Sequence, residues 1–264
     1  SGNAAPYSLL TIISTVAWGL GYFGMPHILL RFMAIEDEKK LKLSRRVATI
    51  WVVISLFVAV FIGVIGYTMS KVGALEMLTG SNSETIIVKI SALLSQHGVI
   101  FALLAGVILA GILASTMSTS DSQLLAASSA VSSDILGAFR KDSSNKNGSM
   151  AAARITLLVI SVVAAFIARN PDSSVFAIVS FAWAGFGAAF GPVVLFSLFW
   201  KRTNKWGALA GMVCGGSMVF IWKYLIRPLG GIWNIYELLP AFLIACAAIV
   251  IVSLLTPKPS KEIE

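Results

Sequence analysis

The chain has 264 residues, of which 57% are hydrophobic and only 12% are charged, whereas an ordinary soluble domain has about 25% charged residues. This composition excludes a soluble globular protein and predicts an all-α membrane protein, with residues 1–264 forming a single transmembrane domain. The net charge of +8 does not indicate nucleic-acid binding, because the basic residues stand in short loops beside apolar segments and are not interleaved with aromatic residues.

Seven apolar segments are each long enough to cross about 30 Å of hydrocarbon as a helix. They are expected at residues 7–30, 47–69, 98–122, 151–168, 175–200, 206–226 and 238–256. The first begins shortly after Ser1, with neither an initiator Met nor a signal peptide before it, so we expect the chain to be a fragment of a longer protein. Between the second and third segments, residues 86–94 have the apolar pattern of a short surface helix.

The first segment contains three glycines and a proline that interrupt an apolar helix, in the run Trp-Gly-Leu-Gly-Tyr-Phe-Gly-Met-Pro-His at 18–27. Pro26 lacks a backbone donor and clashes with the carbonyl of Tyr22, and the glycines lower the cost of leaving helical angles. We therefore expect the segment to unwind or bend sharply between Gly19 and Pro26. Trp18 and Tyr22 would then wall a midplane cavity for a solute. A simple proline kink with interfacial aromatic residues is the alternative.

A block of hydroxyl side chains follows the apolar run of the third segment, reading Ser-Thr-Met-Ser-Thr-Ser-Asp-Ser at 115–122. At helical spacing several of these side chains share one stripe, and hard oxygen ligands suit small cations, so the block is a candidate ion site. Alternatively, the hydroxyls let two membrane helices approach closely or bond back to their own carbonyls. Asp121 either completes a cation path or, as we favour, caps the helix end near cytoplasmic water.

The fifth segment is a second candidate for interruption, because it carries glycines at 185, 187 and 191 in front of Pro192. These residues predict either a hinge that acts as an outer gate or close packing between helices. The residues alone favour neither interpretation.

The basic residues divide unevenly between the two sides of the membrane. Loops at 31–46, 134–154 and 201–205, with the tail after 256, hold 15 of the 20 Lys and Arg. Because cytoplasmic loops are rich in Lys and Arg, this side is predicted to be cytoplasmic, with the C-terminus inside and the first residue outside.

The run Phe-Trp-Lys-Arg-Thr-Asn-Lys-Trp-Gly-Ala-Leu-Ala-Gly at 199–211 combines a basic pair, four further residues, Gly-Ala and another Gly. With residues 17–31 and the hydroxyl block from Ser115, it resembles the sodium:solute symporter family, and within that family the bacterial members that transport proline. The resemblance covers the whole chain. It implies part of a leucine-transporter-type fold, in which two five-helix repeats are inverted, and makes the seven segments the last seven of thirteen.

The resemblance implies sodium-coupled secondary uptake of L-proline across the bacterial inner membrane by alternating access, with sodium as the coupling ion and no organic cofactor. The residues that match the family's sites are Trp18, Tyr22 and Pro26 for proline, and Ser115, Thr116 and the backbone carbonyl of Ile112 for sodium. Other sodium ligands of the family, including an acidic residue, come from a first core helix that this chain lacks. The chain by itself is therefore not expected to transport.

A sodium-coupled symporter for another small solute and an ion channel are the alternatives to proline uptake. A channel is expected to show a pore-lining ring or a filter loop between spans, and the sequence contains neither. An intramembrane enzyme is the weakest interpretation, because Asp121 and His27 are the candidates near membrane depth and they do not pair.

Overall fold

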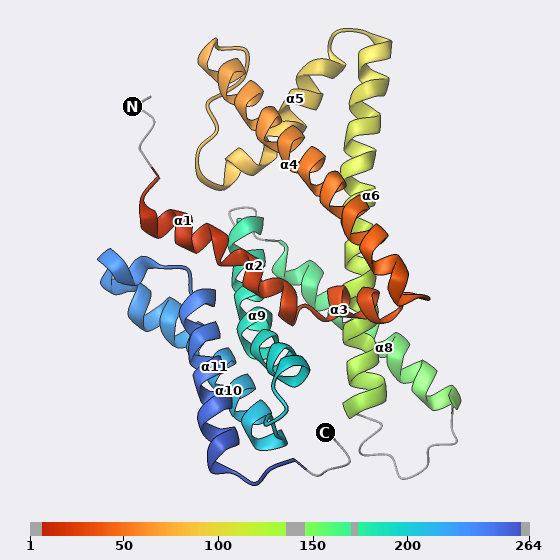
Figure 1. Cartoon of the computed structure of the whole chain (residues 1–264). Coiled ribbons are helices and arrows are strands. Elements are labelled where there is room, and N and C mark those ends of the chain that lie inside the picture. Colours follow the sequence, from red (N-terminus) through yellow and green to blue (C-terminus); the bar gives the residue numbers. More distant parts are fainter. Residues whose placement is uncertain (1–6, 136–145, 170–173, 260–264) are drawn as a thin grey trace. The chain divides into compact units, whose positions relative to one another are not determined.

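The computed structural model describes residues 7–135, 146–169 and 174–259, and every regular element in these ranges is a helix (Figure 1). The all-α prediction is confirmed for this part of the chain. The chain divides into two compact units, one formed by Ser1–Met33 with Phe176–Glu264 and the other by Ala34–Val175. They are called unit 1 and unit 2 below.

Unit 1 begins with a helix in several pieces and ends with three longer helices. Its main elements are α1 (Leu9–Val16), α2 (Trp18–Gly21), η1 (Tyr22–Gly24), α3 (Pro26–Met33), α9 (Val175–Phe199), α10 (Lys205–Ile221) and α11 (Leu238–Leu255). Three short turns lie between α10 and α11, namely η5 (Trp222–Ile226), η6 (Arg227–Leu229) and η7 (Gly231–Asn234). α10 and α11 pack side by side along their length (Figure 1).

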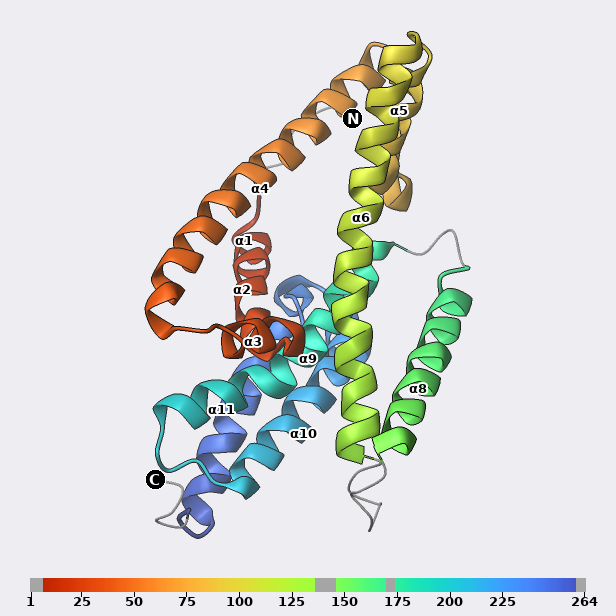
Figure 2. The same ribbon diagram turned by 90° about the vertical axis from the view of Figure 1, so that its right-hand side faces the viewer.

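Unit 2 combines long helices with a short one. Its elements are η2 (Glu38–Lys40), α4 (Leu41–Lys71), η3 (Gly80–Thr85), α5 (Ile86–Ser95), α6 (Val99–Ser129), η4 (Ala130–Ile135) and α8 (Lys146–Ile167). α5 is the short helix that the sequence predicts, and it packs along α6 (Figure 2). The Ser128 hydroxyl donates to the carbonyl of Ala153 at 2.8 Å, which ties α6 to α8.

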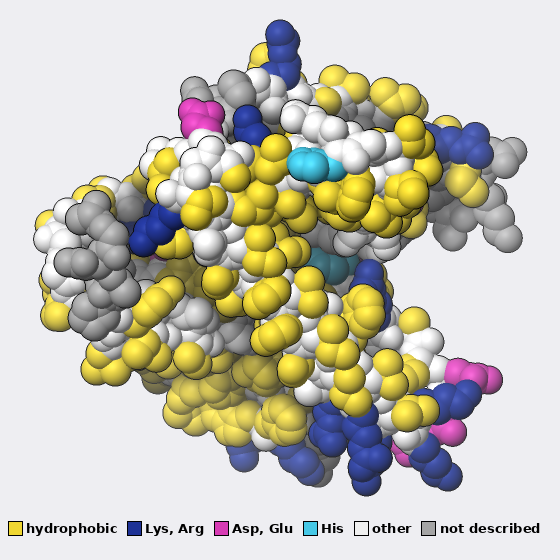
Figure 3. Space-filling view, turned by 90° about the horizontal axis from the view of Figure 1, so that it is seen from above, with side chains coloured by type: hydrophobic (Ala, Val, Ile, Leu, Met, Phe, Trp, Pro, Cys, Tyr) yellow, Lys and Arg dark blue, Asp and Glu magenta, His cyan; other side chains and the backbone are white. Residues whose placement is uncertain are grey.

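The number of spans agrees with the sequence prediction. The described residues contain six helices long and apolar enough to cross a membrane, and seven if the bent pair Leu9–Gly24 and Pro26–Met33 counts as one span. Large hydrophobic side chains are exposed over much of the surface, as suits a protein surrounded by lipid (Figure 3). The third span runs past the expected end, because α6 continues to Ser129. Asp121 thus lies inside a helix, and its interpretation as a cap at the helix end is wrong.

α9 shows why the fifth segment carries so many glycines. Although Pro192 lies inside it, α9 is one continuous helix. A Cβ on Gly187 would meet the backbone of Gly21 at 2.7 Å, and a Cβ on Gly191 would meet a ring atom of Phe242 in α11 at 2.7 Å. Small residues at these two positions let α9 approach α2 and α11. The structure therefore favours close packing over a hinge.

The run at 199–211 connects α9 to α10 in the chain. It also forms a junction between the start of α10 and the end of α11. The side-chain oxygen of Asn204 accepts a hydrogen bond from the backbone of Gly207 at 2.9 Å and caps the start of α10. The amide nitrogen of Asn204 donates to the hydroxyl of Thr256 at 2.7 Å, just after the end of α11. Gly207 itself lies against Ser253 of α11. The motif therefore joins two helices at one end.

Candidate functional site

The first span is broken where the sequence predicts a break. α2 ends at Gly21, the chain tightens into the 3₁₀ turn η1, and Met25 is extended with φ −86° and ψ 110° before α3 begins at Pro26. The two halves are bent by 55°. Pro26 is the first residue of a helix, where its missing N–H costs no intrahelical hydrogen bond. The expected bend between Gly19 and Pro26 is confirmed, and the span is not one kinked helix.

Trp18 lies in a cluster of aromatic side chains from three parts of unit 1. Its ring stacks with those of Phe176 and Trp183 in α9, at centroid distances of 5.4 and 5.9 Å. It also stacks with Tyr236, just before α11, at 5.7 Å. Pairs of this kind contribute about 0.5–1.5 kcal/mol each beyond their buried area. The cluster therefore holds the half-buried Trp18 in one orientation beside the break.

Trp183 also holds the broken turn through its indole nitrogen. This nitrogen donates to the carbonyl of Trp18 at 3.0 Å, in the turn where backbone acceptors lose their helical partners. A Cβ on Gly21 would overlap the indole of Trp183, so this close approach requires glycine. Tyr22 meets the Trp183 ring edge-on at a centroid distance of 4.9 Å, yet 55% of Tyr22 remains exposed. Tyr22 is thus an exposed aromatic residue at the break, as is its neighbour Phe23.

Tyr236 ties the segment before α11 to two other helices. Its backbone N–H donates to the hydroxyl of Ser14 at 3.1 Å, and its phenol donates to the carbonyl of Ser180 at 2.6 Å. Burial, with the neighbouring carboxylate of Glu237, raises the pKa of Tyr236 well above its usual value. The phenol therefore keeps its proton and remains a donor. Glu237 is itself buried and accepts from Arg227 at 2.8 Å.

The sequence pattern does not single out Phe176, Trp183 and Tyr236. The one available signal is Trp183, because a bulky indole inside a run of Ala and Gly needs a specific partner to pack against. Nothing in the local pattern connects Phe176 or Tyr236 with Trp18.

The hydroxyl block lies on α6 in unit 2. Thr116 Oγ1 donates to the carbonyl of Ile112 at 2.9 Å, and Ser120 Oγ donates to the carbonyl of Thr116 at 3.0 Å. The back-bonded arrangement, one of the two alternatives, is therefore present. It also places the Thr116 hydroxyl and the Ile112 carbonyl side by side, with the exposed Ser115 next to them in the chain. Coordination of sodium by these oxygens stays a prediction.

The six residues assigned from the resemblance thus form two sets. Trp18, Tyr22 and Pro26 stand together at the break in unit 1, and Ile112, Ser115 and Thr116 share about one turn of α6 in unit 2. Each set offers chemistry that suits its assignment. The break combines aromatic surface with a backbone that leaves helical geometry at Met25, and α6 presents neutral oxygen atoms of the kind that hard cations accept.

Comparison with curated proteins finds several similar transporters. The osmoregulated proline transporter OpuE of Bacillus subtilis is 40% identical over 254 residues, which cover 96% of this chain and 50% of that protein. The sodium/proline symporter of Haemophilus influenzae is 41% identical over 256 residues, covering 96% and 50%. That of Escherichia coli K12 is 39% identical over 258 residues, covering 97% and 49%. The chain spans about half the length of the curated relatives it matches. No solved structure matches it.

A comparison with protein-family models agrees with these relatives. The model described as the sodium:solute symporter family matches residues 4–215, which include the broken span, the hydroxyl block and the junction motif. The match therefore takes in both candidate sites and most of the chain. On this evidence the chain belongs to the sodium:solute symporter family.

Proposed function

We propose that the chain is the C-terminal part of a sodium-coupled symporter that takes up L-proline across the bacterial plasma membrane. The observation that carries the proposal is the broken first span, in a chain of this family, with an exposed tyrosine beside the break. The names of the relatives at about 40% identity supply the solute and the ion. The C-terminus is proposed to lie in the cytoplasm, on the side that holds most Lys and Arg.

Proline is proposed to bind at the break. The helix dipole of α3 favours a negative group near its N-terminus, and the C-terminal end of the helix before the break favours a positive one. A zwitterionic amino acid offers both charges. Trp18, Tyr22 and Pro26 line this position, and the exposed ring of Tyr22 gives an apolar surface for the pyrrolidine.

Sodium is proposed to bind to the hydroxyls of Ser115 and Thr116 and the carbonyl of Ile112. An ion must replace the hydrogen that Thr116 donates to Ile112, so Thr116 turns its hydroxyl hydrogen away when the ion binds. The remaining ligands are proposed to come from the rest of the symporter. Coupling then requires that sodium binds more tightly to the form that accepts proline.

Uptake of radiolabelled proline by the full-length protein in proteoliposomes tests this function. We expect accumulation that depends on an inward sodium gradient, saturates with proline and is not supported by potassium. A panel of unlabelled solutes added as competitors checks the choice of solute. If the protein accumulates a different solute and not proline, that solute is the substrate. A sodium current that does not saturate and carries no solute would favour a channel.

A further inference from the structure

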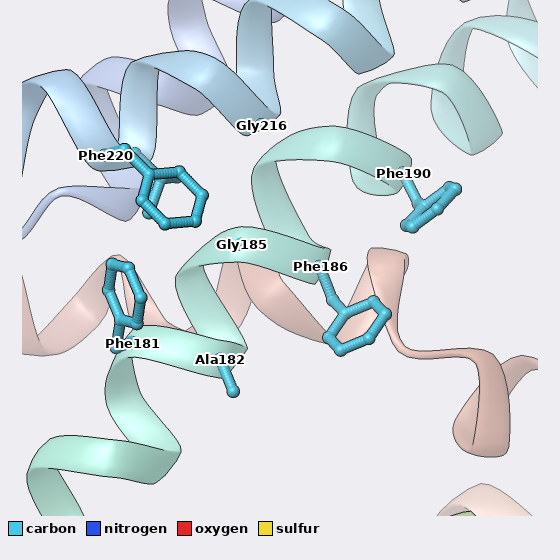
Figure 4. Close-up of a pocket in the computed structure, with 8 residues that line it drawn as sticks. Phe181, Ala182, Gly185, Phe186, Phe190, Gly216 and Phe220 are labelled. Atoms are coloured by element: carbon cyan, nitrogen blue, oxygen red, sulfur yellow. The ribbon is translucent and has the colours of Figure 1, made fainter. Parts of the chain in front are cut away.

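α9 and α10 enclose an apolar groove on the surface of unit 1, with a volume of about 280 Å³. Figure 4 shows Phe181 and Phe220 facing each other from the two helices, with Phe186 and Phe190 farther along α9. The rings of Phe181 and Phe220 meet edge-on at a centroid distance of 5.2 Å. The groove is thus a slot walled by aromatic rings.

Two glycines, Gly185 and Gly216, line this groove and leave it open. A Cβ on Gly185 would have no other atom within 4 Å, and one on Gly216 would touch only Ala189, at 3.9 Å. They differ from Gly187 and Gly215, where a Cβ would collide with a neighbouring helix. Helix packing in unit 1 therefore does not account for Gly185 and Gly216. Their effect is to keep space free beside the aromatic rings.

A cation lies at one end of the groove. The Lys223 ammonium is 3.7 Å from the ring centroid of Phe181 and 5.8 Å from that of Tyr224. In the part of the chain that the structure describes, the ion pairs are Lys40–Glu36 and Arg227–Glu237, so Lys223 pairs with no carboxylate there. Lys223 stands near the end of the span Lys205–Leu229, where a lysine can reach the headgroup layer.

We propose that this groove binds one phospholipid with a net negative headgroup. Its acyl chain lies over Gly185 and Gly216, with the Phe181–Phe220 pair on one side and Phe186 and Phe190 on the other (Figure 4), and its phosphate pairs with Lys223. The charge at the end of the groove favours this occupant over an apolar helix from elsewhere in the protein, because a lipid phosphate offers Lys223 the opposite charge at the headgroup layer and an apolar helix offers none. Because lipid tails are as apolar as the groove, the selectivity comes from the shape of the slot and from the phosphate.

Native mass spectrometry of the full-length protein, equilibrated with equal amounts of phosphatidylglycerol and phosphatidylcholine, tests the site. We expect the wild type to retain one phosphatidylglycerol. Gly185→Leu fills the groove and should abolish this adduct. Lys223→Gln should lower the preference for phosphatidylglycerol about fivefold, the equivalent of about 1 kcal/mol for one cation at a lipid headgroup. Gly63→Leu is the matched control, because a Cβ on Gly63 in α4 also meets nothing within 4 Å.

Equal retention of phosphatidylglycerol by the wild type and Gly185→Leu would overturn the proposal. So would a thermal midpoint, measured after the bound lipid has been removed with detergent, that falls for Gly185→Leu but not for Gly63→Leu, because without lipid such a loss would mean that another part of the protein fills the groove. An unchanged lipid preference in Lys223→Gln would contradict the pairing of the phosphate with Lys223. The measurement reports lipid binding and not uptake, so its outcome is independent of the proposed transport of proline.

Discussion

Gly21 and Gly19 lie in the same short helix but have different surroundings. A Cβ on Gly21 would overlap the indole of Trp183, whereas one on Gly19 would meet nothing within 4 Å. We expect Gly21→Ala to lower the free energy of unfolding by about 1–3 kcal/mol, since the indole must move and gives up its hydrogen bond to the carbonyl of Trp18. Thermal unfolding of the purified full-length protein measures this effect.

Gly19→Ala is the control for that change. Alanine favours a helix by about 1 kcal/mol over glycine, so this variant should be as stable as the wild type or more stable. Two variants of equal stability would contradict the close approach of Trp183 to the broken turn. The same pair can be compared for proline affinity, where Gly21→Ala should again be the weaker.

The hydroxyls of α6 give a second comparison of single residues. Replacing Ser115 or Thr116 with Ala should raise the sodium concentration for half-maximal proline uptake at least about fivefold, the equivalent of about 1 kcal/mol for one lost oxygen contact. Thr116→Ser and Ser115→Thr keep an oxygen in place and should do less harm. Uptake by the full-length protein across a sodium titration, corrected for surface expression, measures the shift.

Packing alone predicts the opposite ranking of harm among these variants. If the hydroxyl side chains served only to let two helices approach closely, Ala would be tolerated and the larger side chain of Ser115→Thr would be harmful. Unchanged sodium dependence in both Ala variants would remove Ser115 and Thr116 from the sodium site. Thr116→Ala also deletes the bond to the carbonyl of Ile112, so stability should be measured alongside.

Among the elements, the contact between α10 and α11 depends on small residues at one helix face. Gly207 lies against Ser253, and Gly211 lies against Ile249. Gly207→Ala should destabilise the protein by about 1–3 kcal/mol, because its Cβ would collide with Ser253 and with the carbonyl of Ile249. A thermal unfolding curve detects the loss, and Ser253→Ala in the same chain should restore part of it.

Gly216→Ala is the matched control on α10. Its Cβ would make only an ordinary contact with Ala189 at 3.9 Å, so its thermal midpoint should stay within error of the wild type or rise. Equal losses for Gly207→Ala and Gly216→Ala would show that glycine itself, and not its contact with α11, sets the stability of this helix.

For the whole molecule, the distribution of charge predicts the orientation in the membrane. Residues 39–46 contain five of the Lys and Arg assigned to the cytoplasmic side. Single cysteines placed there in the full-length protein, on a cysteine-free background, should react with an impermeant thiol reagent only after the cells are opened. A cysteine in the segment before α5, at residues 72–79, should react in intact cells. Labelling with the reverse pattern would invert the proposed topology.

The sequence by itself determined the composition class, the approximate spans and the break. The break follows from Pro26 and its neighbouring glycines, whose effects on backbone angles are local and need no distant partner. Span edges were less well determined. α6 extends to Ser129 because its hydroxyls, such as those of Ser120 and Ser122, donate to backbone carbonyls four residues earlier and Asp121 is exposed, so polarity at Asp121 did not mark the end of the helix.

Only the tertiary structure decided what surrounds the break and what the glycines of α9 do. Trp18 stacks with Tyr236, far along the chain, and Trp183 of α9 donates to the carbonyl of Trp18 at the start of the broken turn. α9 continues as one helix through Pro192, and Gly187 and Gly191 on one of its faces pack against α2 and α11. These outcomes depend on which side chains meet after the helices pack. Helical periodicity and local propensity describe one segment at a time and carry no information about such contacts.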